Sequence, residues 1–208
     1  MRAREVLRWI LIAVYSVLWA GGILSRILPN IGHPPWAAPL FLLCAAGIVA
    51  LGTDLNTILV FAGGGFLAEW IGVHTGFPFG RYTYTAALGP GIGGVPAAIA
   101  CAWVTLLLFA RDLARWITVR RWAGAAVGAA VMTSLDLLVD PVATRVLAYW
   151  RWDQPGFFFG VPLVNFAGWF GVSALLLSAR PCLVNSGRTA IPIGLSVIVF
   201  FGAIAVLG

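Results

Sequence analysis

The sequence predicts an all-α polytopic transmembrane helix bundle with about seven spans. Of its residues, 61% are hydrophobic and only 10% are charged, whereas a soluble domain carries about 25% charged residues. The apolar residues also fall into seven segments, each close to the roughly 20 residues that a membrane-crossing helix needs. A chain of 208 residues therefore has room for one integral membrane domain and for no sizeable soluble domain beside it.

The predicted spans are 6–25, 37–53, 56–74, 94–110, 122–139, 161–179 and 189–207. The first follows a basic N-terminus and lacks a clean small-residue cleavage site after it. We therefore interpret it as a span and not as a removed signal peptide. The second span is the weakest, and a tight turn that contains Asp54 joins it to the third. Within the third, Gly63, Gly64 and Gly65 have no phosphate-loop context and are expected to let another helix approach closely.

The arginines predict the orientation of the bundle. All thirteen basic residues are arginines, and with the N-terminus inside, nine of them lie on the inner side and four on the outer side. The positive-inside rule then places the N-terminus in the cytoplasm and the protein in the cell (inner) membrane. The inner set is Arg2, Arg4, Arg8, Arg111, Arg115, Arg120, Arg121, Arg180 and Arg188, and the outer set is Arg26, Arg81, Arg145 and Arg151. The net charge of +6 thus indicates topology signals and not a nucleic-acid partner.

Residue counts exclude several kinds of chemistry. The chain has no lysine, so a retinal-type Schiff base cannot form. Its three cysteines (Cys44, Cys101 and Cys182) include no CxxC pair, which argues against a disulfide framework or a zinc site. Two histidines, His33 and His74, are too few for an oxygen-activating di-iron site. We therefore expect no metal site.

Two long outer connections, 75–93 and 140–160, lead into a short internal repeat. GVPAAIACAW (94–103) and GVPLVNFAGW (160–169) share Gly-Val-Pro and a Trp nine residues after the Gly. The offset between the copies runs from 65 (Pro90 to Pro155) to 67 (Glu69 to Asp136). The pattern predicts two parallel units, about 56–110 and 122–179, with a site between them. Pro in the first helical turn explains part of the match without any duplication.

Three acids inside or beside the predicted spans are the candidate catalytic residues: Glu69, Asp136 and Asp140. A charge at the bilayer centre costs at least about 2.5 kcal/mol, so such residues default to a functional hypothesis. Asp136 and Asp140 are four residues apart and share one helix face. Removal from water favours a neutral carboxyl group, which can donate a proton.

Structural interpretations of the acids stay open. Asp140 precedes Pro141, so it can equally cap a short interfacial helix that begins there. Asp136 and Glu69 can pair with Arg145, Arg151 or Arg81, or make an interhelical hydrogen bond. Asp54 is interpreted as a solvated turn residue and Asp112 as a loop charge beside Arg111.

Aromatic and polar residues near the acids complete the candidate site. Trp150, Trp152, Phe158 and Trp169 cluster with the second unit, and Tyr82 with the first. Aromatic faces suit a polyene and stabilise a nearby cation, although an ordinary interfacial belt is the alternative. The polar candidates are Arg81, His74 and Asn165. His74 is either a proton relay or an interfacial residue with one backbone contact, and Asn165 either orients a water or a carboxyl group or bridges two helices.

The segments EWIGVHTGFPFGRYTYT (69–85), GVP (94–96), DLLVDPVA (136–143), YWRW (149–152) and GVPLVNFAGW (160–169) together resemble the carotenoid biosynthesis family of CruF-type hydratases. The resemblance covers about residues 60–175. It implies an integral membrane enzyme of the hydro-lyase class, without a cofactor, that adds water across the terminal isopropylidene C=C of an acyclic or monocyclic carotenoid. The implied partners are the carotenoid and the lipid bilayer. The resemblance does not assign a catalytic role to any individual residue.

Chemistry suggests the roles. Hydration of such an alkene needs an acid to protonate it, a stabilised tertiary cation, and a base to take a proton from the attacking water. We predict Asp136 as the acid and Glu69 or Asp140 as the base, with the reverse assignment open. Trp150 and Trp152 would stabilise the cation. A membrane transporter, which also uses acids between repeats, and a non-catalytic carotenoid-binding protein are the alternative functions.

Overall fold

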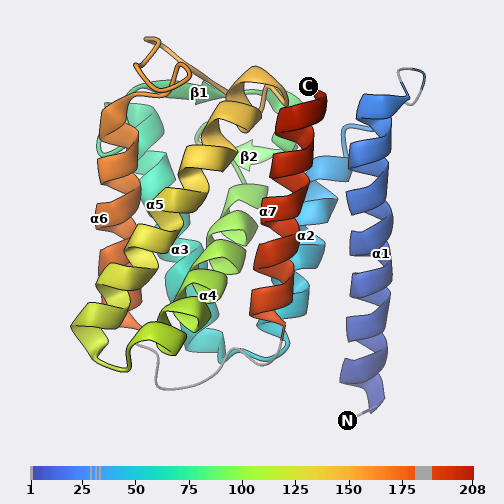
Figure 1. The fold of residues 1–208 in the computed structure, drawn as a ribbon, viewed down its shortest axis with the longest axis vertical. Coiled ribbons are helices and arrows are strands. Elements are labelled where there is room, and N and C mark those ends of the chain that lie inside the picture. Colours follow the sequence, from blue (N-terminus) through green and yellow to red (C-terminus); the bar gives the residue numbers. More distant parts are fainter. Residues whose placement is uncertain (1, 29, 31, 33, 181–188) are drawn as a thin grey trace.

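The computed structural model describes residues 2–28, 30, 32, 34–180 and 189–208. In this part of the chain seven helices form a bundle, and short strands cover one end of it (Figure 1). The helices are α1 (Arg2–Ile27), α2 (Ala37–Ala50), α3 (Leu55–Thr75), α4 (Ala98–Ile117), α5 (Arg121–Arg145), α6 (Leu163–Ala179) and α7 (Ala190–Leu207). Three residues named above, His33, Cys182 and Arg188, lie outside the described ranges.

The predicted all-α membrane bundle is confirmed, and each of the seven predicted spans corresponds to one helix. Helices α1, α3, α5 and α7 are long and apolar enough to cross a membrane. Helices α2 and α6 are apolar but shorter, with 14 and 17 residues. Helix α4 has 20 residues and carries Arg111, Asp112 and Arg115 near its end.

Helix α4 is the central element of the bundle. Its residues from Trp103 to Asp112 are all buried, and it packs against α2, α3, α5 and α7. A helix that is buried all round in this way is enclosed by the others and does not face lipid. Helix α1 stands at the edge of the bundle, beside α2 and α7 (Figure 1).

Both long connections lie at the end of the bundle opposite the N-terminus (Figure 1). Strands β1 (Tyr82–Tyr84) and β4 (Trp150–Trp152) pair in antiparallel register, with Tyr82 opposite Trp152 and Tyr84 opposite Trp150. The remaining short elements are η1 (Ala86–Leu88), β2 (Gly91–Ile92) and β3 (Val95–Pro96). Because alternate residues of a strand point to opposite faces, the ribbon of β1 and β4 turns its four aromatic side chains toward the bundle and leaves Thr83 and Arg151 exposed.

Helix α5 corrects one interpretation of the acids. It runs without a break through Asp140 and Pro141 to Arg145, so the idea that Asp140 caps a new helix is wrong. Proline removes one backbone donor, which frees only the carbonyl of Leu137 from its helical bond. The helix continues because Asp140 is 1% exposed and its side chain binds inside the bundle.

Two further expectations fail at helix boundaries. Asp112 is not a loop charge, because α4 continues to Ile117 and buries it beside Arg111, with 3.7 Å between Arg111 Nε and Asp112 Oδ1. The Gly-Val-Pro segments do not place Pro in the first helical turn. Pro96 belongs to β3, before α4 begins, and Pro162 is the N-cap of α6.

The glycine triplet of α3 brings helices close together, as expected, at two of its three positions. A Cβ on Gly64 would lie 2.4 Å from Leu176 Cδ2, and one on Gly65 would lie 2.2 Å from Trp103 Cγ. Gly63 has nothing within 4 Å of its Cβ position. Gly64 therefore admits α6, and Gly65 admits the indole of Trp103.

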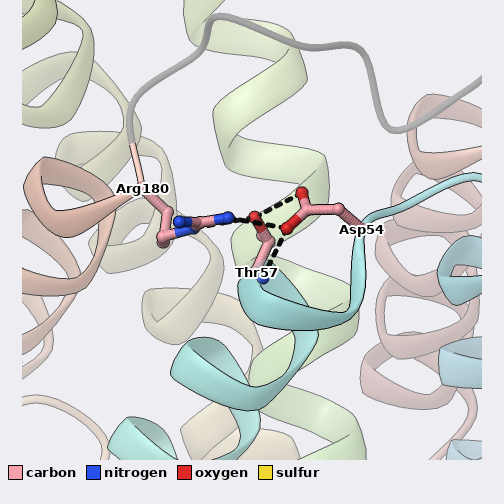
Figure 2. Close-up of polar contacts among 3 residues, drawn as sticks. All are labelled: Asp54, Thr57 and Arg180. Atoms are coloured by element: carbon pink, nitrogen blue, oxygen red, sulfur yellow. Dashed lines mark hydrogen bonds and ion pairs between the residues drawn. The ribbon is translucent and has the colours of Figure 1, made fainter.

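Asp54, Thr57 and Arg180 link α3 to α6 at the other end of the bundle (Figure 2). The Asp54 carboxylate accepts from Thr57 N (2.9 Å), Thr57 Oγ1 (2.7 Å) and Arg180 Nη2 (2.6 Å). Asp54 is thus the N-cap of α3 and not only a solvated turn residue. The hydrogen bonds from Thr57 and the nearby guanidinium of Arg180 lower the pKa of the Asp54 carboxyl.

Candidate active site

Glu69 of α3 is 5% exposed and accepts hydrogen bonds from three neutral donors. Tyr82 OH and Tyr84 OH donate to its Oε2, the second over 2.8 Å. The indole Nε1 of Trp103 donates to its Oε1 over 3.0 Å. Residues from α3, β1 and α4 therefore converge on one carboxyl group.

Asp140 of α5 is held in a matching way by the second half of the chain. Its Oδ1 accepts from Trp150 Nε1 and Trp152 Nε1, both at 3.1 Å, and its Oδ2 accepts from Asn165 Nδ2 at 2.9 Å. An indole nitrogen can only donate, so Oδ1 acts as the acceptor of both bonds. Strand β4 and helix α6 thus place three donors on Asp140.

Asp136 lies one turn before Asp140 on the same face of α5, as predicted. Its Oδ2 is 2.5 Å from Asn165 Nδ2, so one amide group binds both aspartates. Its Oδ1 is buried and has no hydrogen-bond partner among the described residues. Asn165 therefore does both things considered for it, because it orients carboxyl groups and also bridges α5 and α6.

Among the residues that the structure describes, no arginine is a partner of these acids. In the described part of the chain, the side chains that bind Glu69 and Asp136 are Tyr82, Tyr84, Trp103 and Asn165, all neutral. The salt bridges considered for Arg81, Arg145 or Arg151 are not formed. The acids are instead held by hydrogen bonds between elements.

Aromatic rings from the two halves of the chain meet between the acids. Tyr82 lies 5.1 Å from Trp152 and Tyr84 lies 5.8 Å from Trp150, measured between ring centroids. Trp103 stacks on Trp169 at 4.7 Å with 15° between the ring planes. Trp103 and Trp169 are the tryptophans that end the two Gly-Val-Pro segments. The site therefore lies between the two proposed repeat units, although the repeat itself stays a prediction.

Burial affects the loop tyrosines around the site. It raises the pKa of Tyr82 and of Tyr84, and the charge of Glu69 raises both further. Burial also raises the pKa of Tyr149 to about 12. These phenols therefore keep their protons over the physiological pH range, and those of Tyr82 and Tyr84 act as hydrogen-bond donors to Glu69.

A cavity with an empty volume of about 880 Å³, including its mouth, extends from these acids across the bundle. Its wall includes Glu69 and Asp140 but not Asp136. The polar and aromatic residues of the wall are Phe41, Glu69, Phe79, Tyr82, Tyr84, Trp103, Thr105, Asp140, Tyr149, Trp150, Trp152, Asn165, Trp169 and Phe201. Part of this volume is open to solvent, and the enclosed part has room for several water molecules.

The predicted site residues divide into two groups. Glu69, Asp140, Tyr82, Trp150, Trp152, Asn165 and Trp169 line the cavity, and Asp136 lies behind Asn165. Three others do not line it. Arg81 is exposed immediately before β1. His74 is exposed and contacts Trp70 O through Nδ1 at 2.7 Å, and Phe158 packs on Phe166 at 5.6 Å. His74 thus makes the single backbone contact considered for it.

Two residues that bind Glu69 were missing from the predicted site: Tyr84 and Trp103. Both had a signal in the sequence. Tyr84 is two residues from Tyr82, which is the strand spacing that puts both side chains on one face, and Trp103 is the repeat counterpart of Trp169. The cavity residues of α2 and α7 had no such signal, because those spans show only hydropathy.

Comparison with known proteins adds three findings. A family model described as carotenoid biosynthesis protein matches residues 36–206. Bisanhydrobacterioruberin hydratase from Haloarcula japonica is 36% identical over 116 residues, which cover 52% of this chain. The aligned part spans only 39% of that relative's length. No solved structure matches the chain.

Proposed function

Since the chain belongs to the carotenoid biosynthesis protein family, we propose that it is a carotenoid hydratase. The reaction adds water across the terminal isopropylidene C=C of an acyclic or monocyclic carotenoid and gives a tertiary alcohol. One observation carries the proposal. Two carboxyl groups, Glu69 and Asp140, face a single cavity whose other walls are almost wholly aromatic or aliphatic.

The chemistry needs an acid, a water molecule and a base. The alkene π pair takes a proton from one carboxyl group and forms a C–H bond at the less substituted carbon, which leaves a tertiary cation. A water oxygen then forms the C–O bond, and the second carboxylate takes the water's extra proton. The net change is the addition of one water. The proton must return from the second carboxyl group to the first before the next turnover.

The geometry favours Asp140 as the acid that contacts the alkene. Asp136 and Asp140 converge on one amide and have neutral partners, and two negative charges so close together in a low dielectric are unfavourable. One proton shared by this pair is therefore the favoured state. Asp136 is not part of the cavity wall, so in this scheme it acts through Asp140 and Asn165.

Glu69 is then the base. Its three donors stabilise a carboxylate, because each hydrogen bond favours the charged form. The rings of Trp150, Trp152 and Tyr82 line the space between the two acids, where their faces can stabilise a cation.

The cavity suits a neutral hydrocarbon. The hydroxyl and indole donors of Tyr82, Tyr84, Trp103, Trp150 and Trp152 are already bound to the carboxyl groups. A substrate that needs hydrogen-bond donors, such as a diphosphate, would find these groups occupied and two acids beside it.

We place the N-terminus in the cytoplasm, which puts the site in the outer half of the cell membrane.

The test is an isotope experiment with membranes that contain the full chain and an acyclic carotene. In water enriched in the heavy oxygen isotope, the product should carry that isotope in its new hydroxyl group. In deuterium oxide it should carry one carbon-bound deuterium beside the alcohol carbon. Oxygen derived from O₂ would overturn the proposal. Bound but unchanged carotene would indicate a binding protein, and movement of carotene between vesicles without product would indicate a carrier.

A further inference from the structure

The cavity has an apolar arm that the proposed chemistry does not use. It is the part of the wall that α2 and α7 contribute, together with Leu106 of α4, and all of its side chains are hydrocarbon. The residues of this apolar arm are Phe41, Leu42 and Ala45 of α2, Leu106 of α4, and Val197 and Phe201 of α7. All except Leu42 are buried. The arm is therefore continuous with the reaction site and chemically different from it.

Helix α1 covers the outside of the apolar arm. Tyr15 stacks on Phe41 at 4.6 Å, and Phe41 also stacks on Phe200 of α7 at 5.2 Å. The Tyr15 hydroxyl is 2.7 Å from Ser196 Oγ, and Trp19 Nε1 donates to Ser196 O over 3.0 Å. Hydrogen bonds around one residue of α7, Ser196, thus fasten α1 over the place where α2 and α7 meet.

Helix α1 is peripheral in two other respects. The family model begins at residue 36, after α1 has ended at Ile27. The outward face of α1 is apolar and exposed, with Trp9 at 69% and Val17 at 71%, as expected for a surface in contact with lipid. Phe41, in the wall of the arm, stacks on Tyr15 of α1, so α1 lies beside the arm and presents its exposed face to the bilayer.

We infer that the apolar arm holds the hydrocarbon chain behind the reacting double bond, and that this chain reaches the bilayer between α2 and α7, beneath α1. The inference rests on the proposed function and deepens it. Only the end group of a carotenoid reacts, so its long chain must lie in an apolar environment. The ribbon of β1 and β4 and the stacked pair of Trp103 and Trp169 close other sides of the reaction site, whereas the arm is lined with hydrocarbon.

Small side chains in the arm are then the residues that decide which substrates enter. Ala45 of α2 and Val197 of α7 are both buried in its wall. A larger side chain at either position would fill space that the chain needs. It would leave the acids and their donors in place, because these lie on other elements: α3 to α6 and the ribbon of β1 and β4.

The experiment compares two substrates in three variants of the full chain. The substrates are a full-length acyclic carotene and a short hydrocarbon that ends in the same isopropylidene group. The variants are Ala45→Leu, Val197→Phe and, as the control, Ala167→Leu on the exposed face of α6. We expect Ala45→Leu and Val197→Phe to lower turnover of the carotene by about 10-fold or more, as misfit in a hydrophobic pocket does. Turnover of the short substrate should stay near the wild-type rate, and Ala167→Leu should affect neither.

Two results would overturn the inference. One is an equal loss of turnover with both substrates in Ala45→Leu and Val197→Phe protein that unfolds at the wild-type temperature. The other is no loss of turnover with either substrate. Carotene binding, followed by pigment that co-purifies with each variant, keeps the test separate from the hydratase proposal. If the wild type bound carotene without hydrating it, the proposed function would fail. Weaker binding in Ala45→Leu and Val197→Phe would still support the path of the chain, and unchanged binding would refute it.

Discussion

Tyr82 and Trp152 lie opposite each other in the two-stranded ribbon of β1 and β4, yet they bind different acids. Their ring centroids are 5.1 Å apart. Tyr82 OH donates to Glu69 on α3, and Trp152 Nε1 donates to Asp140 on α5. The ribbon therefore ties together two helices that belong to different halves of the chain, and it sets both carboxyl groups against one cavity. A substitution of either Tyr82 or Trp152 should therefore alter the positions of both carboxyl groups.

The first prediction concerns the two aspartates of α5. Asp140→Asn should lower hydration by about 100-fold or more, the contribution typical of a general acid, because it removes the carboxyl group in the cavity wall. Asp136→Asn should have a smaller effect, since Asp136 is outside that wall. The measurement is the initial rate of alcohol formation per amount of folded protein. Asp153→Asn, on the exposed loop, is the control, and a larger loss in Asp136→Asn would contradict the assignment.

Tyr84→Phe tests the hydrogen bonds that hold Glu69. The change removes one donor to Oε2, at 2.8 Å, and we expect a loss of about 1–3 kcal/mol in the free energy of unfolding together with slower turnover. Tyr149→Phe is the matched control, because Tyr149 also lines the cavity but binds neither acid. Thermal unfolding in detergent gives the stability. Equal effects of the two changes would show that the hydrogen bond to Glu69 adds neither stability nor activity.

Neighbouring glycines in α3 should respond in opposite ways to alanine. In Gly65→Ala the new methyl would overlap the Trp103 side chain, which donates to Glu69. We expect about 1–3 kcal/mol of destabilisation from this overpacking and a loss of activity. Gly63→Ala has open space and should be neutral or stabilise by up to about 1 kcal/mol, through helix propensity. The measurements are the unfolding temperature and the hydration rate of each variant. Similar values for Gly65→Ala and Gly63→Ala would refute the packing argument.

A pH prediction follows from the lowered pKa of Asp54. A carboxyl whose pKa is lowered in the folded protein stabilises it above the ordinary value of 3.8, and this contribution is lost as the pH falls through the folded value. Asp54→Asn keeps a good helix cap but loses the ion pair with Arg180. Because both partners of this pair are partly exposed, the pair contributes about 0–1 kcal/mol to the free energy of unfolding. The unfolding temperature of the wild type should exceed that of Asp54→Asn at neutral pH. As the pH falls below 3.8, the two unfolding temperatures should converge. A difference between them that does not change with pH would show that it does not come from ionisation of Asp54.

The sequence by itself determined the class of fold and much of the site. Hydropathy alone located all seven helices, because a bilayer forces each span to be a long apolar segment that satisfies its own backbone. The acids, the aromatic loops and the Gly-Val-Pro segments located both sides of the candidate site. Asp136 and Asp140 were expected on one face because the helix period decides this without any knowledge of packing.

Only the tertiary structure decided how these groups combine. The pairing of β1 with β4 joins residues about 70 positions apart in the chain, and no local pattern encodes that register. The pattern DPVA suggested a helix start, but burial of the Asp140 side chain against Trp150 and Trp152 kept α5 continuous. The apolar arm arises because α2, α4 and α7 meet, and hydropathy cannot tell a side chain that faces a cavity from one that faces lipid. Both environments favour the same residues, so the difference appears only when the helices are packed.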